Sequence, residues 1–246
     1  MAREQEIPEG YSIAVLHTHT TKSDGVVSPS RLVGAAAENS IRVLAITDHD
    51  TKAGVAEAQK AGAALGVDVI SGEEITTGFF RPKHIIGLNL EKPVPYLKNP
   101  EWTIEEIRKH GGLVIIPHPM NGIAAFEGRD VENLAKKGLI DGIEIINGHG
   151  NYKQQSRLKS LLDTLGDKVG ALLGAPDCHF GDQDLLSAYT IFPGKSLEDF
   201  FKAVENRTTR PIQGSVTQIP LAERVKQHFR ANVVLGIRRY LLRNLK

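Results

Sequence analysis

The stretch RVLAITDHD, residues 42–50, decides the fold of this chain of 246 residues. Its first part, residues 42–47, is a mostly apolar run, which is typical of a buried strand. Asp48, His49 and Asp50 follow at once, so that ligand-type side chains stand where the strand ends. In α/β sheets and barrels the active site lies at the carboxyl ends of the strands. The stretch therefore predicts an α/β fold with a functional site at that edge.

Apolar runs of this kind recur along the whole chain. Short apolar runs alternate with longer stretches of helical periodicity, which predicts strands and helices in βα succession and hence a parallel sheet or barrel. The expected strands are residues 12–17, 42–47, 67–71, 84–90, 113–117, 140–147, 169–174 and 189–192. The first expected helix is capped by Ser28 or Ser30 and runs to about residue 39. The other expected helices are residues 51–65, 103–110, 130–137, 152–165 and 196–206.

The overall composition is that of a globular protein with little net charge. Lys and Arg number 30 against 29 Asp and Glu, and 41% of the residues are hydrophobic. This excludes disordered, collagen-like and coiled-coil chains and provides for one sizeable core. The single Cys178 cannot form an internal disulfide. The polar residues 1–10 and the lack of a run of about 18 apolar residues lead us to expect neither a signal peptide nor a membrane span. We therefore expect a cytoplasmic protein.

The last part of the chain, residues 221–246, differs from the rest. It holds seven Lys and Arg against one acid, a net charge of +6, which leaves −5 for residues 1–220. Apolar residues recur there at every fourth position, namely Val225, Phe229, Val233, Ile237 and Leu241. This spacing predicts a basic amphipathic helix that follows a domain over residues 1–220. We expect the helix to dock on the barrel or to form a dimer interface; contact with a membrane surface or with nucleic acid is the less favoured alternative.

Histidines and carboxylates gather at the ends of the expected strands. Six of the nine histidines stand there: His17, His19, His49, His84, His118 and His179. Acidic groups crowded together raise each other's pKa unless a cation binds them. His17 and His19 are alternate residues of an extended segment, so that both reach the same side and one ion. Imidazole with carboxylate suits Zn²⁺, Mn²⁺ or Fe²⁺, and the pattern predicts a site for several metal ions.

The motifs around these residues resemble those of the PHP family, the polymerase and histidinol phosphatase superfamily of metal-dependent phosphoesterases. They are HTH (17–19) with SDG (23–25), TDHD (47–50), GEE (72–74), the histidine of KHIIGLNL (83–90), PHP (117–119) and DCH (177–179). The resemblance implies a distorted (βα)7 barrel with two or three divalent ions. The ligands it implies are His17, His19, Asp24, His49, Glu74, His84, His118, Asp177 and His179. Glu73 is the alternative to Glu74 as the bridging carboxylate, and His149 is the alternative to His84.

The resemblance also implies an activity, the hydrolysis of a phosphate monoester or of a nucleotide or RNA 5′-end ester by a metal-activated hydroxide. We expect a small phosphorylated substrate. Asp48 and Asp50 are candidates for orienting His49 without binding metal, with a turn and a helix cap as the structural alternative. The side chains expected to contact substrate are Lys22, Arg81, Arg129 and Asn147.

Two other functions share part of this pattern. Metal-dependent amidohydrolases also begin with His-X-His at the first strand of a barrel, but they favour a carboxylated lysine at a central strand end, and no expected strand end here presents one. A metal-stabilised regulatory or scaffolding module without catalysis is the other alternative. The complete set of ligand-type residues favours an enzyme over such a module.

Overall fold

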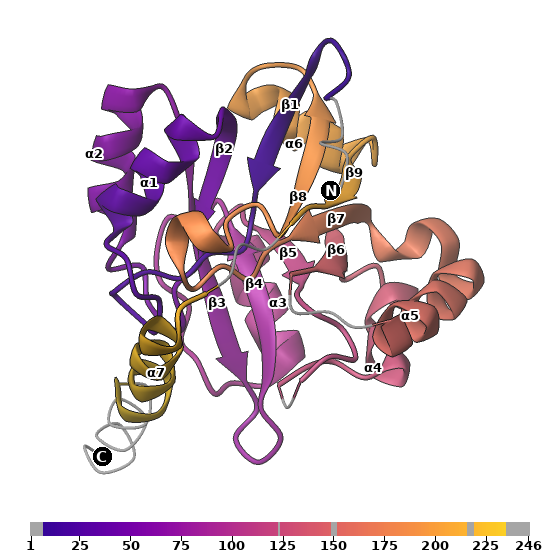
Figure 1. Ribbon diagram of the computed structural model, residues 1–246. Helices are drawn as coiled ribbons and strands as arrows, with labels where there is room; N and C mark the ends of the chain where they lie inside the picture. The colour runs from indigo at the N-terminus through magenta and orange to yellow at the C-terminus, as the bar shows by residue number, and fades with distance from the viewer. Residues whose placement is uncertain (1–6, 123, 149–151, 216–218, 235–246) are drawn as a thin grey trace.

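The strands form one sheet that curls into a nearly closed barrel (Figure 1). The computed structural model describes residues 7–122, 124–148, 152–215 and 219–234. The strands are β1 (Tyr11–Val15), β2 (Ile41–Ile46), β3 (Asp68–Thr77), β4 (Lys83–Leu88), β5 (Leu113–Ile116), β6 (Gly142–Asn147), β7 (Ala171–Ala175), β8 (Ala188–Pro193) and β9 (Arg210–Gln213). Their order in the sheet is β7-β6-β5-β4-β3-β2-β1-β8-β9.

The barrel predicted from the sequence is confirmed, but the succession of strands and helices is less regular than expected. β4 pairs antiparallel with β3 and β5, and β8 pairs antiparallel with β1 and β9. No helix separates β3 from β4, because the expected strands 67–71 and 84–90 are two arms of one hairpin. β9 was not expected from the sequence, since RPIQ is short, carries proline and is not apolar.

The segments that follow β1 and β7 meet at the edge where most strands end. Thr18, just after β1, forms a parallel bridge with Cys178, just after β7. His19 N donates a hydrogen bond of 2.8 Å to Cys178 O, and Cys178 N donates one of 3.1 Å to His17 O. The first and last motifs of the sequence therefore close the barrel where they also carry their ligand-type side chains.

Helices cover the outside of the sheet. They are α1 (Pro29–Glu38), α2 (Val55–Leu65), α3 (Pro100–Lys109), α4 (Gly128–Lys136), α5 (Tyr152–Leu165), α6 (Leu197–Glu205) and α7 (Leu221–Phe229). Ser28 caps α1 through its hydroxyl, which accepts from Arg31 N at 3.2 Å, as expected for one of the two candidate caps. α2 begins later than the expected residue 51, because the Thr51 hydroxyl accepts from Ala53 N and holds this segment in a turn.

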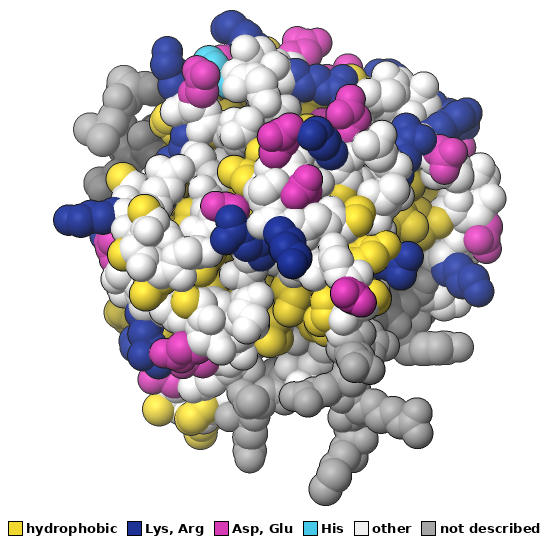
Figure 2. Space-filling view, turned by 90° about the horizontal axis from the view of Figure 1, so that it is seen from above, with side chains coloured by type: hydrophobic (Ala, Val, Ile, Leu, Met, Phe, Trp, Pro, Cys, Tyr) yellow, Lys and Arg dark blue, Asp and Glu magenta, His cyan; other side chains and the backbone are white. Residues whose placement is uncertain are grey.

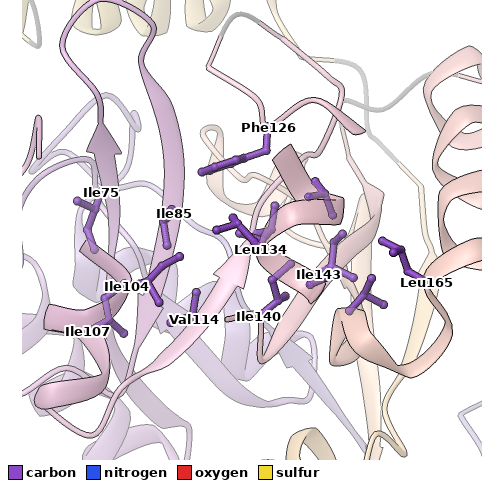
Figure 3. Packing of buried hydrophobic residues seen from close by; sticks show 14 of the residues in the cluster. Ile75, Ile85, Ile104, Ile107, Val114, Phe126, Leu134, Ile140, Ile143 and Leu165 are labelled. Atoms are coloured by element: carbon purple, nitrogen blue, oxygen red, sulfur yellow. The ribbon is translucent and has the colours of Figure 1, made fainter. Parts of the chain in front are cut away.

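The largest hydrophobic cluster lies between β3–β6 and helices α3–α5 (Figure 3). Ile75 and Ile85 face each other across the β3–β4 pair, and both are fully buried. Ile104 and Ile107 of α3 pack against them from outside the sheet. This packing fixes the two strands that carry Glu74 and His84, and it therefore sets the register of those side chains.

Figure 2 shows the face of the barrel where β1 and β3 begin. Side chains of both charges are interspersed there among apolar ones, with no single sign prevailing (Figure 2). Among the described helices, none is long and apolar enough to cross a membrane. Residues 235–246 of the expected C-terminal helix lie outside the described residues, and a one-turn π-helix, Arg230–Val234, directly follows α7.

Candidate metal centre

The side chains singled out by the motifs converge at one edge of the barrel, towards which the arrows of β1 and β3 point in Figure 1. Most of them follow a strand directly, whereas Glu74 lies within the long strand β3. β4 runs in the opposite direction, so that His84 near its start reaches the same edge. The nine side chains that meet there are His17, His19, Asp24, His49, Glu74, His84, His118, Asp177 and His179.

Four of these side chains form a first group. His17 Nε2 and His19 Nε2 lie 3.1 Å apart, and each is 3.2 Å from Glu74 Oε2. Asp177 Oδ1 lies 3.2 Å from His17 Nε2 and 3.3 Å from His19 Nε2. Ligand atoms at about 2.0–2.1 Å from a tetrahedral ion are themselves about 3.3 Å apart. The four donors therefore have the spacing of one metal site.

A second group lies beside the first and shares His19. Asp24 Oδ2 is 3.2 Å from His179 Nε2 and 3.9 Å from His49 Nε2. The His19 ring stacks between those of His49 and His179, with centroid distances of 4.5 and 4.3 Å. One donor atom from each of these four residues lies within 4.8 Å of the others, which is a suitable arrangement for a second ion.

Glu74 faces several histidines with its two oxygens. Oε2 belongs to the first group and also lies 3.2 Å from His49 Nδ1. Oε1 lies 2.8 Å from His84 Nδ1 and 3.0 Å from His118 Nε2. A carboxylate whose two oxygens face different sets of donors has the geometry needed to bridge two ions.

Glu73 faces the other side of β3, because successive side chains of a strand alternate. Its Oε2 accepts a hydrogen bond of 2.9 Å from Val94 N. Of the two adjacent acids, the sheet therefore presents Glu74 to the histidines. Of the two candidate histidines, His84 lies in the cluster, and His149 lies outside the described residues.

Glu144 is a buried residue of the centre that the sequence analysis missed. Its Oε1 lies 2.8 Å from His17 Nδ1, and its Oε2 accepts from His118 N at 2.8 Å and from Asn147 Nδ2 at 2.9 Å. Glu144 fixes the ring of His17 so that Nε2 points into the first group, which is how a carboxylate commonly supports a metal-binding imidazole. The available signal was a single acid within the apolar strand GIEIIN.

The carboxylate of Asp48 lies among amide and hydroxyl groups of the loop after β1, and its expected role in orienting His49 stays a prediction. Its carboxylate accepts from Thr20 N at 2.8 Å, from Thr20 Oγ1 at 2.7 Å and from Ser23 Oγ at 2.6 Å. It therefore holds the loop that carries Asp24. Asp50 accepts from Thr76 N at 2.7 Å and so ties the end of β2 to β3.

The side chains expected to contact substrate lie in different places. Lys22 is half exposed and pairs with Glu57 at 3.3 Å. Arg81 lies exposed in the β3–β4 hairpin, and Arg129 lies exposed in the first turn of α4. Asn147 is buried, and it donates to Glu144. The described contacts of Lys22 and Asn147 are thus with other protein groups, and the substrate role of all four residues stays a prediction.

The charges of the cluster are strongly coupled. Burial lowers the pKa of His19, but its hydrogen bonds to Asp177 and Glu74 outweigh burial and raise the pKa to about 10. Burial dominates at His49 and lowers its pKa to about 3. Burial raises the pKa of the Glu74 carboxyl, but the neighbouring His84, His17 and His49 outweigh it and hold the pKa well below its usual range. The lowered pKa values of Glu74, Asp24 and Asp177 favour the ionised carboxylates, and the raised pKa of His19 favours its protonated ring beside them.

The donor set fits divalent metal. The buried ring nitrogens His19 Nδ1 and His118 Nδ1 make no hydrogen bond within the described chain. Such atoms cost stability unless something binds them. Imidazole nitrogens and carboxylate oxygens at this spacing suit Zn²⁺, Mn²⁺ or Fe²⁺. A cleft of about 510 Å³ opens onto His49, Glu74, His118 and Asp177, so that a ligand can reach the cluster from solvent.

A family model described as the PHP domain matches residues 15–116, which include six of the nine clustered residues. An uncharacterized protein of Methanocaldococcus jannaschii, MJ1587, is 37% identical over 147 residues, which cover 55% of this chain and 82% of that protein. The chain belongs to the PHP family. The family predicted from the motifs is therefore confirmed.

Two further comparisons agree with this assignment. A 5′-3′ exoribonuclease of Haemophilus influenzae is 48% identical over 81 residues, which cover 32% of this chain and 30% of the exoribonuclease. A solved two-domain protein of Bacteroides vulgatus, which contains a predicted PHP-like metal-dependent phosphoesterase, has a TM-score of 0.70 at 20% identity over 92% of this chain and 72% of its own. The former supports the predicted class, a hydrolase of phosphate esters, and the latter supports the fold.

Proposed function

We propose that the protein hydrolyses a phosphate ester of a nucleotide or of an RNA 5′ end, with two or three divalent ions held by the nine clustered side chains. The single observation that carries the proposal is the position of Glu74, whose two oxygens lie within 2.8–3.2 Å of nitrogens of five histidines. A carboxylate in this position supports a centre of more than one ion. Mn²⁺, Zn²⁺ and Fe²⁺ are the candidates by donor type.

The ions would supply Lewis-acid chemistry, binding the phosphoryl oxygens and lowering the pKa of a water molecule so that it attacks near neutral pH. The residues of the chain hold this centre in place. His17, His19, Glu74 and Asp177 would hold one ion, and Asp24 and His179 would contribute to another. Glu144 orients His17, and Asp48 keeps the Asp24 loop against β2.

The β3–β4 hairpin supports a nucleotide as the substrate. Phe79 and Phe80 lie in its turn, four to five residues before His84, and are 49% and 91% exposed. Their rings are edge to face, with centroids 5.1 Å apart. Exposed aromatic rings beside a phosphate site are surfaces on which bases stack. The exoribonuclease relative agrees with a substrate of this class.

The two alternatives are less well supported. An amidohydrolase centre requires a lysine among the bridging groups, whereas the ion-pair partners of Glu74 and Asp24 in the described chain are all histidines. A binding module without activity does not need an open cleft over the metal donors. Such a cleft is present here, and it favours an enzyme.

The test is phosphate release by the purified protein after its bound metals have been identified. With added Mn²⁺, we expect inorganic phosphate from at least one of a panel of nucleotides, histidinol phosphate and short 5′-phosphorylated RNA. His17→Ala and Asp177→Ala should abolish release while the fold persists. Metal-loaded protein that releases no phosphate from any ester, or that releases ammonia from an amide instead, would overturn the proposal.

A further inference from the structure

We propose that the C-terminal helix α7 holds Asp24 in the position that the second group of metal donors requires, and so sets the affinity of that group for its ion. The positioning residues are Gln227 of α7 and Arg230 directly after it, which act on the ion through Asp24. The inference rests on the part of the proposed function that assigns an ion to this group. The members of the group are His19, Asp24, His49 and His179.

Asp24 is the member of the second group that the sheet holds least. The three histidines of the group belong to, or directly follow, the two backbone bridges that lie beyond the strand ends. Asp24 instead lies in a turn of the Asp24 loop, residues 20–25, between β1 and α1. The position of its carboxylate therefore depends on the groups that hold this loop.

The Asp24 loop is held from two sides. From the end of β2, Asp48 accepts hydrogen bonds from groups of the loop, among them the Ser23 hydroxyl at 2.6 Å. From the end of α7, the Arg230 guanidinium donates to the backbone oxygens of Thr21 and Ser23, the latter at 3.3 Å. The Ser23 carbonyl belongs to the peptide bond that joins it to Asp24. The guanidinium thus fixes the backbone from which the Asp24 side chain extends.

Gln227 reaches the Asp24 carboxylate itself. Its Nε2 donates to Asp24 Oδ2 at 3.4 Å, and this oxygen lies 3.2 Å from His179 Nε2 and 3.9 Å from His49 Nε2. Gln227 therefore holds the oxygen that faces other members of the group. Asp24 is only 3% exposed, so that protein groups rather than solvent decide the orientation of its carboxylate. Carboxylates that bind metal are commonly fixed by hydrogen bonds of this kind.

α7 turns its polar face to the metal centre, and Figure 1 shows it beside the loop that follows β1. Gln227 and Arg230 are three residues apart and share this face. Leu221, Val225 and Phe229 lie away from it, with exposed fractions of 76%, 61% and 61%. A helix that packs for stability alone buries its apolar residues. The contact with the metal centre is made by polar groups instead, as expected of a helix that fixes a donor.

The test compares Mn²⁺ binding by chelator-treated Gln227→Leu and Arg230→Gln proteins with that of Arg224→Gln. Arg224 lies on the same helix but makes no hydrogen bond to the Asp24 loop within the described chain, so that its substitution is the matched control. We expect the ion of the second group to bind about tenfold more weakly in the first two variants. The control should bind it as tightly as the natural protein does, and the ion of the first group should bind equally in all of them.

A double substitution separates positioning from a general loss of structure. Asp24→Ala should remove the ion of the second group. Adding Gln227→Leu to Asp24→Ala should then change the affinity for the remaining ion no further, because Gln227 acts through the Asp24 carboxylate. Arg230→Lys retains a cationic donor and should bind the second ion more tightly than Arg230→Gln does.

Two results would overturn the inference and leave the proposed function standing. One is equal affinity of Gln227→Leu and Arg224→Gln for the second ion, or ion binding that Asp24→Ala does not weaken. The other is an effect of Gln227→Leu that persists in the Asp24→Ala protein, because α7 would then act on the barrel as a whole. Neither measurement needs a substrate. Natural protein that binds both ions and hydrolyses no phosphate ester would contradict the proposed function alone.

Discussion

Glu73 and Glu74 are neighbours in the chain with opposite surroundings, because β3 turns successive side chains to opposite faces. Glu74 faces the histidines, and Glu73 accepts from the backbone of Val94. Glu74→Gln removes the charge of the shared carboxylate, and we expect the purified variant to retain at least one ion fewer per chain. Glu73→Gln should retain the full metal content and lose about 1 kcal/mol of unfolding free energy. Metal analysis and denaturant unfolding of both variants check this pair.

The carboxylate of Glu144 acts through His17. Glu144→Gln weakens its hold on Nδ1, and we expect metal affinity to fall about 10- to 100-fold while the fold is retained. Glu106 offers a matched control, since it pairs with His110 at 3.1 Å on α3, away from the centre. Glu106→Gln should leave metal affinity unchanged. Equal metal affinity of the Glu144→Gln variant and the natural protein in a competitive titration would contradict the orienting role.

The side chains that cluster at the barrel edge could be predicted from the sequence, whereas those that support them could not. The two histidines of HTH have a fixed spacing because both must reach one ion from one segment. Glu144 has no such constraint, since it meets His17 only after the barrel has closed. Asp48 shows the same limit, because its contacts with Thr20 and Ser23 form only when the loop after β1 lies against the end of β2.

The loop after β1 requires close approach of two backbone segments. A Cβ on Gly25 would lie 2.2 Å from His19 O, so that Gly25→Ala must displace either the Asp24 loop or the end of β1. We expect a loss of about 3 kcal/mol of unfolding free energy, together with weaker metal binding.

Gly34 in α1 provides the comparison for this loop. A Cβ there meets no atom within 4 Å. Gly34→Ala should therefore raise stability by up to about 1 kcal/mol through helix propensity alone. Denaturant unfolding checks both variants, and a Gly25→Ala protein as stable as the natural one would show that the close approach is not needed.

The positions of the strands could largely be predicted from the sequence, but the directions in which they run in the sheet could not. Periodicity located eight of the nine strands, because buried strands are apolar throughout. It gave no sign that β4 and β8 run against their neighbours, since direction depends on which strands pair. The reversed direction of β4 explains why His84, at the start of its strand, joins ligands that follow theirs.

The whole molecule should respond to pH in opposite ways with and without metal. The pKa of His19 is raised to about 10 in the fold, so that its contribution to stability is present below its ordinary pKa of 6.5 and is lost as pH rises towards 10. Metal-free protein should therefore become less stable between pH 7 and 10. Metal binds the neutral imidazole and removes this loss. Thermal unfolding across this range, with chelator and with Mn²⁺, checks the prediction, and a parallel decline in both conditions would contradict it.

The near-zero net charge of the chain is a balance between an acidic body and a basic end, and the structure brings the two together. α7 contacts the Asp24 loop through Gln227 and Arg230, so that basic residues stand beside a centre rich in carboxylates. The division into a domain over residues 1–220 and a helix over 221–246 stays a prediction, and residues 235–246 lie outside the described residues.

The central claim is that the clustered residues form a centre of more than one ion that hydrolyses phosphate esters. The most direct measurement is a titration of chelator-treated protein with Mn²⁺ during which bound ions and released phosphate are followed together. The account predicts no release without metal and release that develops as the second ion binds to each chain. Full release in the presence of chelator, or no release once two ions are bound, would contradict it.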